Sequence, residues 1–110
     1  MTKLSLKPGV ATCGVGAEVF LIVHVALQVW DLRGEPSLTV TSLTDGVHRT
    51  DSLHYKGLAV DIRVRDLHNS PNVLCADLAS ALGQDYDVIF EIDHIHVEYD
   101  PDRPRQEVKS

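Results

Sequence analysis

Cysteine is scarce in this chain. Only two cysteines, Cys13 and Cys75, occur among 110 residues, and neither belongs to a CxxC pair. A disulfide framework needs more cysteines, and cysteine-based metal or redox motifs place them at short spacings. We therefore expect two reduced thiols with structural roles.

Positive charge is also in short supply. Ten Lys and Arg stand against sixteen Asp and Glu, which gives a net charge of −6 and a pI near 5.3. The basic residues are scattered along the chain, whereas neutralising nucleic-acid phosphates requires a clustered basic surface. This balance argues against a nucleic-acid-binding protein.

No hydrophobic run is long enough for a membrane or an export signal. The N-terminus, MTKLSLKPGV, lacks the apolar segment of a signal peptide. The longest apolar stretch, AEVFLIVHVALQVWDL, contains four polar residues and is shorter than the ~20 residues that span a bilayer. We expect a protein that is cytoplasmic when made and makes no membrane contact.

Length and composition fit one globular domain. Single domains commonly have ~100–150 residues, and 44% of this chain is hydrophobic. No fixed-period repeat or low-complexity tract divides it. We predict a single domain over 1–110, with a core at about 17–101 and a polar tail at 102–110.

The first long element is predicted to be a helix over about 16–32. Its polar residues recur at helical spacing in one narrow stripe, namely His24, Gln28 and Asp31. The remaining side chains would then be buried, including Phe20, Leu27 and Trp30. Gly34 and Pro36 end the helix. Its many β-branched residues leave a strand as the alternative.

The rest of the chain alternates between strand and helix patterns. SLTVTS (37–42) and GLAVDIRV (57–64) are β-rich, and Asp45-Gly46 marks a turn between them. Ser70-Pro71 is typical of a helix start, and the helical pattern ends at Gly83. DYDVIFEI and HIHVEYD are two further strands. The order predicts an α+β fold, with a mainly antiparallel sheet and helices packed on it.

Histidines and carboxylates gather in two of the predicted strands. Alternation places His94, His96 and Glu98 on one face and Asp93 on the other. Asp61 would lie beside the histidine pair if these strands are neighbours in the sheet. His54 precedes the Asp61 strand, in a loop that can fold over the strand's end.

Two imidazoles and one carboxylate suit a catalytic zinc site. Tetrahedral zinc binds such ligands at ~2.0–2.1 Å and keeps its fourth position for water. A nearby carboxylate must then move protons, and Asp93 and Glu91 are the candidates. The same donor set also suits non-haem Fe(II), and isolated HxH pairs are often ordinary surface residues.

Two linked motifs resemble those of a known family. SLHYKGLAVD fits S-x-H-x-x-G-x-A-x-D, and DHIHVEYDP fits the HxH region that follows it. Over roughly 17–101 the chain resembles the zinc D-Ala-D-Ala carboxypeptidases, within the group that includes lysostaphin-type peptidases and hedgehog signalling domains. The likeness is strongest to compact phage and prophage members. It implies a hedgehog/DD-peptidase-like fold.

The resemblance also implies roles for individual residues. It makes His54, Asp61 and His96 the ligands of one Zn²⁺ ion. The general base of many members lies three residues before the last ligand, at Asp93, and Glu91 is the alternative. His94 matches a residue that lies beside the metal and contacts substrate or the oxyanion.

Substrate recognition departs from the family pattern. Many members bind the substrate carboxylate through an arginine in a T-S-G-Y-R-like stretch, but this chain has TSLTDG there. Arg49 or Arg63 could supply the bidentate fork instead. Ser52 matches a family serine whose hydroxyl can hold the ligand loop.

The resemblance implies hydrolysis of peptidoglycan stem peptides. The bond that is cut is of the D-Ala-D-Ala or the L-Ala-D-Glu type, and both remain open. A phage-derived protein without an export signal would reach the cell wall after lysis or by delivery. The alternative function is a non-catalytic zinc-binding module or an accessory subunit of a phage assembly, because hedgehog domains keep the metal site yet act as binding proteins.

Overall fold

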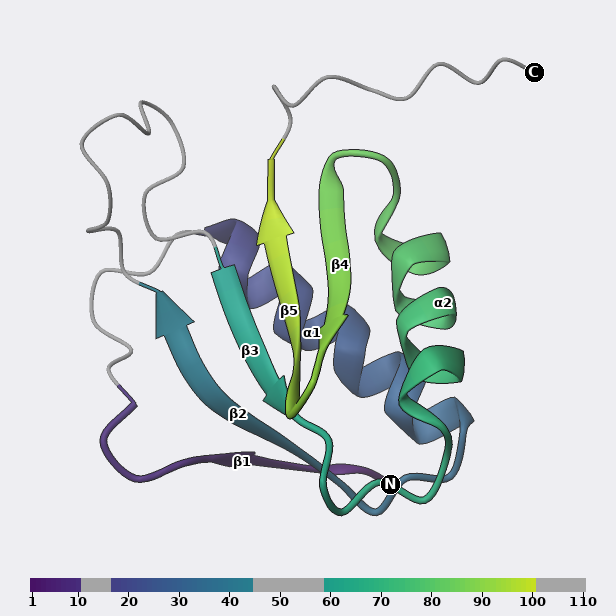
Figure 1. Cartoon of the computed structure of the whole chain (residues 1–110). Coiled ribbons are helices and arrows are strands. Elements are labelled where there is room, and N and C mark those ends of the chain that lie inside the picture. The colour runs from purple at the N-terminus through teal and green to yellow at the C-terminus, as the bar shows by residue number, and fades with distance from the viewer. Residues whose placement is uncertain (11–16, 45–58, 101–110) are drawn as a thin grey trace.

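Five strands and two helices make up the described part of the chain (Figure 1). The computed structural model describes residues 1–10, 17–44 and 59–100. In chain order the elements are β1 (Lys3–Leu6), α1 (Ala17–Leu32), β2 (Ser37–Thr44), β3 (Ala59–Arg63), α2 (Pro71–Leu82), β4 (Tyr86–Glu91) and β5 (His94–Tyr99).

The strands form one sheet in the order β1-β2-β3-β5-β4. β1 pairs with β2 in parallel, and every other pairing is antiparallel. The predicted α+β class with a mainly antiparallel sheet is confirmed. The order places β3 next to β5, which brings Asp61, the last residue of the first motif, beside the two histidines of the second.

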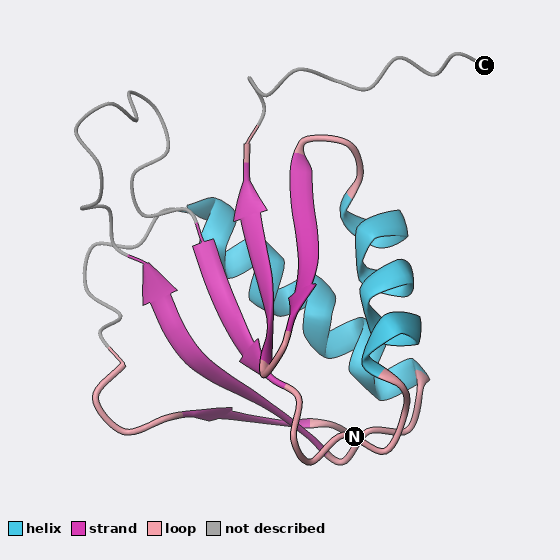
Figure 2. Ribbon diagram, viewed as in Figure 1, coloured by secondary structure: helices cyan, strands magenta, loops and turns pink. Residues whose placement is uncertain are grey.

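Both helices pack on the same face of the sheet. Figure 1 shows α1 crossing behind the strands, and Figure 2 shows α2 (cyan) beside β4 (magenta). Leu74 and Leu78 of α2 belong to the same buried core as the inward residues of α1. Alternation along the strands separates the two faces, because Val60, Ile62, Ile95 and Val97 are fully buried in the helix-facing core. The residues between them point to the opposite, open face.

The predicted first helix is confirmed, and the strand alternative is wrong. Trp30 and Ile22 are fully buried and help to anchor α1 on the sheet. Phe20, however, is 57% exposed, so the expectation that it is buried is wrong. It lies four residues before His24 and therefore belongs to the outward polar stripe. Leu27 is only partly buried.

α2 has the predicted start and end. Ser70 is its N-cap and its hydroxyl accepts a hydrogen bond from the Asn72 backbone N–H, with Pro71 at the first helical position. Gly83 follows the helix with φ of 97°, a conformation that favours glycine. No helix among the described residues is long and apolar enough to cross a membrane.

β1 is an element that the sequence did not predict. It has four residues and lies at the edge of the sheet. Backbone hydrogen bonds from Lys3 N to Pro36 O (3.0 Å) and from Lys7 N to Val40 O (2.9 Å) hold its two ends. A strand this short has little local signal, because its stability comes from pairing with a distant segment.

A buried carboxylate joins two loops at one end of the sheet. Glu35 is 2% exposed and accepts hydrogen bonds from the backbone N–H groups of His68 and Asn69 and from the Asn69 side chain, at 2.7–3.0 Å. Burial raises the pKa of Glu35, but these hydrogen bonds outweigh it and leave the pKa below its usual value. The carboxylate is therefore ionised and fully engaged.

Of the two cysteines, Cys75 lies on α2 and is a free, partly buried thiol. Burial raises its pKa, so the reactive thiolate is disfavoured. This agrees with the expected structural role. Cys13 lies outside the described residues.

Candidate metal centre

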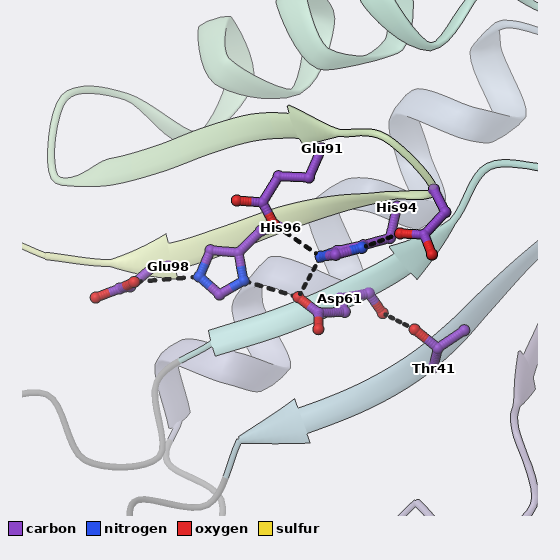
Figure 3. Close-up of polar contacts among 7 residues, drawn as sticks. Thr41, Asp61, Glu91, His94, His96 and Glu98 are labelled. Atoms are coloured by element: carbon purple, nitrogen blue, oxygen red, sulfur yellow. Dashed lines mark hydrogen bonds and ion pairs between the residues drawn. The ribbon is translucent and has the colours of Figure 1, made fainter. Parts of the chain in front are cut away.

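The register between β3 and β5 builds the centre. Asp61 is opposite His96, and Arg63 is opposite His94, in an antiparallel pair. All four side chains therefore point to the open face of the sheet, away from the helices. Figure 3 shows Asp61 of β3 directed toward the two histidines of β5.

Three possible ligand atoms converge at this point. Oδ1 of Asp61 is 2.7 Å from Nδ1 of His96 and 3.7 Å from Nε2 of His94. One ligand atom from each of these residues lies within 4.8 Å of the others. All three side chains are partly buried, which leaves an approach from solvent.

The donor set fits a small divalent metal. Bonds of ~2.0–2.1 Å in a tetrahedral arrangement place neighbouring ligand atoms about 3.3 Å apart. One observed separation is shorter than this and the other is longer. Small side-chain rotations would equalise them. Two imidazoles and a carboxylate suit zinc and also Fe(II).

His96 lies between two carboxylates. Its Nδ1 faces Asp61, and its Nε2 is 3.2 Å from Oε1 of Glu98. The hydrogen bond to Asp61 is the main cause that raises the pKa of His96 to about 9, with a smaller contribution from Glu98 and an opposing effect of burial. At neutral pH the metal-free ring is protonated and donates to both carboxylates. A metal must therefore displace a proton from this ring.

His94 is also held by carboxylates on both sides. Its Nδ1 is 2.8 Å from Oδ1 of Asp93, and its Nε2 is 2.9 Å from Oε1 of Glu91. The hydrogen bond to Asp93 is the main cause that raises the pKa of His94, and it also lowers the pKa of Asp93. The ring is thus oriented with Nε2 toward both Glu91 and Asp61.

The two candidate bases occupy different positions. Glu91 ends β4 opposite His94, on the same face as Asp61, and its side chain is 50% exposed. Asp93 lies in the turn before β5, and its side chain is 86% exposed. The turn directs the Asp93 carboxylate to the outer nitrogen of His94 rather than to the nitrogen near Asp61.

The predicted site residues are brought together in part. Asp61 and His96 are neighbours, because β3 and β5 are adjacent in the sheet, which was the condition of the prediction. His94 joins them as a possible ligand rather than only a neighbour. His54, Ser52 and Arg49 lie outside the described residues, so their roles stay predictions.

A bulge in β2 borders the centre. The pairing of β2 with β3 shifts between Val40 and Ser42, so Thr41 is the extra residue. The Thr41 hydroxyl is 3.4 Å from the backbone oxygen of Asp61, as drawn in Figure 3. No local pattern in SLTVTS marks this irregularity.

A cleft of about 440 Å³ opens beside Asp61 and His94. Arg63 was expected near the substrate, and it lines this cleft. Sequence reasoning missed Lys7, Thr41 and Arg65, which line it as well. Lys7 could not have been found locally, because it reaches the cleft only through the unpredicted strand β1.

Comparisons with known proteins give one family. The model of the Hedgehog amino-terminal signalling domain matches residues 23–98, which is more than half of the chain and includes α2, strands β2 to β4 and all of β5 except its last residue. No curated protein and no solved structure gave a match. The matched segment contains Asp61, His94 and His96. Because the family model covers more than half of the sequence, this chain belongs to the family of the Hedgehog amino-terminal signalling domain.

Proposed function

We propose that this domain is a zinc-dependent peptidase that hydrolyses peptidoglycan stem peptides. The observation that carries the proposal is the convergence of Asp61, His94 and His96 beside an open cleft. The resemblance of SLHYKGLAVD and DHIHVEYDP to zinc D-Ala-D-Ala carboxypeptidases supports the peptide substrate. The cut bond is of the D-Ala-D-Ala or the L-Ala-D-Glu type.

Two ligand sets compete for the single zinc ion. The motif resemblance supports His54, Asp61 and His96, whereas the described geometry offers Asp61, His94 and His96. Asp61 and His96 are common to both. We retain His54 as the third ligand, with His94 beside the metal.

When bound, zinc would polarise the scissile carbonyl and lower the pKa of a water molecule to about 7. The protein must move the proton of that water to the leaving amine. Asp93 or Glu91 would do so, and the contact of Glu91 with the inward nitrogen of His94 supports Glu91. His94, which is cationic when it holds a proton between its carboxylates, would stabilise negative charge on the substrate oxygen.

Recognition of the peptide would fall to residues around the ligands. Arg63 lines the cleft and is a candidate for binding a substrate carboxylate, as is Arg49. Ser52 would hold the loop that carries His54. A phage-derived enzyme of this kind would act on the cell wall after lysis or delivery.

A non-catalytic zinc-binding module is the second candidate function. It is favoured by the family match, because the matched family is described as a signalling domain rather than as a hydrolase. In that case the cleft would serve a binding partner or a larger phage assembly. Zinc would still bind, but no peptide would be cut.

Hydrolysis of cell-wall fragments by the zinc-loaded protein separates the two functions. We expect stem-peptide cleavage by the wild type and a loss of about 100-fold or more in Glu91→Ala or Asp93→Ala, whichever is the base. Glu18→Ala, on α1 at the opposite face, is the matched control and should stay active. Stoichiometric zinc without any hydrolysis would establish the binding module instead.

Metal analysis of two variants decides the ligand set. We expect His54→Ala to lose zinc, and His94→Ala to keep about one zinc ion while losing hydrolysis. The reverse pattern, with zinc kept in His54→Ala and lost in His94→Ala, would replace the proposed set by Asp61, His94 and His96.

A further inference from the structure

The hairpin of β4 and β5 exposes several large apolar side chains next to one another. Nine large apolar residues are exposed in the part of the chain that the structure describes, and three of them lie within four consecutive positions, namely Ile89, Phe90 and Ile92. Single exposed apolar residues are ordinary, whereas neighbouring ones often mark a binding site. Phe90 points to the helix side, opposite Ile95, so the open face involves Ile89 and Ile92.

Ile89 lies on the open face, directly beside the metal centre. It is the cross-strand partner of His96, and the Cβ atoms of such partners are about 4.5–5.5 Å apart. The other outward residues of β4 and β5 are acids or histidines, namely Asp87, Glu91, His94, His96 and Glu98. Within these two strands, Ile89 is therefore the one apolar side chain on the open face.

Ile92 belongs to the two-residue turn that joins β4 to β5. It lines the cleft of about 440 Å³ together with Asp61 and His94. Turn formation does not explain an isoleucine at this position, because hairpin turns favour glycine, asparagine and aspartate. Packing within the domain does not explain it either, because Ile92 is 94% exposed. A ligand that enters the cleft would give this side chain a contact.

The two isoleucines lie on either side of Glu91. Ile89 precedes it by two residues on the same face, and Ile92 follows it in the turn. The Glu91 carboxylate is 2.9 Å from Nε2 of His94, the nitrogen that faces Asp61 (Figure 3). A ligand side chain that contacts both isoleucines would therefore lie beside the possible metal ligands and a candidate base.

We propose that Ile89 and Ile92 form an apolar subsite that binds the aliphatic side chain of the substrate residue whose carbonyl lies at the metal. The inference rests on the proposed function and deepens it by naming a substrate class: peptides with alanine or a larger aliphatic residue on the carbonyl side of the cut bond. Alanine occupies that position in both the D-Ala-D-Ala and the L-Ala-D-Glu bond. The subsite thus recognises what the two candidate bonds share.

Zinc-binding probes with different side chains test the subsite without hydrolysis. The probes are the hydroxamic acids of N-acetylglycine, N-acetylalanine and N-acetylleucine, because a hydroxamate coordinates zinc at the position of the scissile carbonyl. Both enantiomers of the alanine and leucine probes are titrated calorimetrically into zinc-loaded protein, since the two candidate bonds differ in the handedness of this residue. Each buried methyl or methylene group strengthens binding about fourfold. We therefore expect the better leucine enantiomer to bind about tenfold or more tightly than the glycine probe.

Two single variants, their combination and one control locate the contact. Ile89→Thr and Ile92→Thr keep a β-branched side chain but replace its ethyl group by a hydroxyl. Each should reduce the preference for leucine over glycine, and the double variant should bring it to within about twofold. Leu32→Thr makes a similar change at an exposed position of α1, on the other side of the sheet, and should keep the full preference. Far-UV circular dichroism of each variant checks that the fold is retained.

The outcomes distinguish this subsite from the proposed function. Equal binding of the glycine and leucine probes by the wild type, no binding of any probe, or an unchanged preference in the double variant overturns the subsite even if peptides are hydrolysed. A preference that the double variant loses supports the subsite even if stem peptides are not cut, in which case only the peptidase fails. Sedimentation velocity adds one outcome: if the double variant changes the oligomeric state but keeps the preference, the isoleucines form a contact between copies of the chain and the subsite is overturned.

Discussion

Two carboxylates of this domain, Glu35 and Asp61, are held in opposite ways. Glu35 is buried and accepts hydrogen bonds from fixed backbone and amide N–H groups. Asp61 is partly exposed and faces two histidines, whose protons can leave. The first arrangement has no exchangeable partner and stabilises the fold. In the second arrangement a metal ion can replace a histidine proton, so only Asp61 is suited to metal binding.

The largest expected effect concerns zinc at Asp61. Asp61→Asn removes the anionic ligand common to both ligand sets, and we expect zinc affinity to fall by more than about 100-fold. Glu35→Gln should leave zinc affinity within about twofold of wild type, because Glu35 does not contact the centre. Competition with a chelating dye measures both. Equal losses of zinc affinity in Asp61→Asn and Glu35→Gln would show that Asp61 has no special role in binding the metal.

The free energy of unfolding should show the reverse order. Glu35→Ala leaves the N–H groups of His68 and Asn69 without their acceptor, at an expected cost of about 2–3 kcal/mol. Asp61→Ala in metal-free protein should cost less than Glu35→Ala, because Asp61 and His96 are both partly exposed and water screens their hydrogen bond. Urea unfolding of zinc-free samples tests this order, and a larger loss in Asp61→Ala would contradict it.

A smaller effect is expected from the carboxylate behind His96. Glu98 contacts the outer nitrogen of this ring at 3.2 Å, which fixes the ring orientation and leaves Nδ1 toward Asp61. Glu98→Gln should lower zinc affinity by about 10-fold. Glu18→Gln, with the same charge change on the opposite face, is the control. Equal affinities in the two variants would show that Glu98 does not support the ligand.

The Asp61 and Glu35 sites should also affect the free energy of unfolding in opposite directions as the pH changes. The pKa of His96 is raised from 6.5 to about 9, so its hydrogen bonds with Asp61 and Glu98 stabilise metal-free protein fully below pH 6.5. That contribution is lost as pH rises through about 9. The pKa of Glu35 is lowered from 4.5, so its contribution is present above that value and is lost in acid.

Unfolding as a function of pH measures both contributions. His96→Gln should remove the part of the decline that extends to about pH 9 and leave the acid limb in place, while His94, whose pKa is also raised, keeps its own part. Glu35→Gln should reduce the acid limb and leave the decline at high pH unchanged. A decline at high pH that is unchanged in His96→Gln would assign it to another group.

The sequence predicted best what depends on neighbouring residues. The start of α2 at Ser70, its end at Gly83 and the alternation of His94 and His96 follow from local spacing and caps. Burial along α1 was less accurate, because Phe20 is apolar but lies on the face turned away from the sheet. Apolar character alone does not determine which side of a helix meets the core.

Long-range pairing limited what could be predicted of the site. Asp61 lies beside His96 because β3 pairs with β5. The alternation of residues along the strands could not predict that pairing. The contribution of Lys7 depends on β1, whose parallel pairing with β2 has no local signature. The resemblance alone predicts His54 as a ligand, and this stays a prediction. The contacts of Glu91 and Glu98 with the histidines could be seen only in the folded structure.

The hairpin of β4 and β5 carries most of the centre in one short piece of chain. A two-residue connection, Ile92 and Asp93, makes Glu91 and His94 direct cross-strand partners. The proposed proton carrier and its neighbouring histidine thus form a local module, fixed by hairpin register. The pair of Glu91 and His94 could therefore be transplanted to another sheet with its hairpin. The complete ligand set requires this topology, because Asp61 comes from a strand that is remote in the sequence.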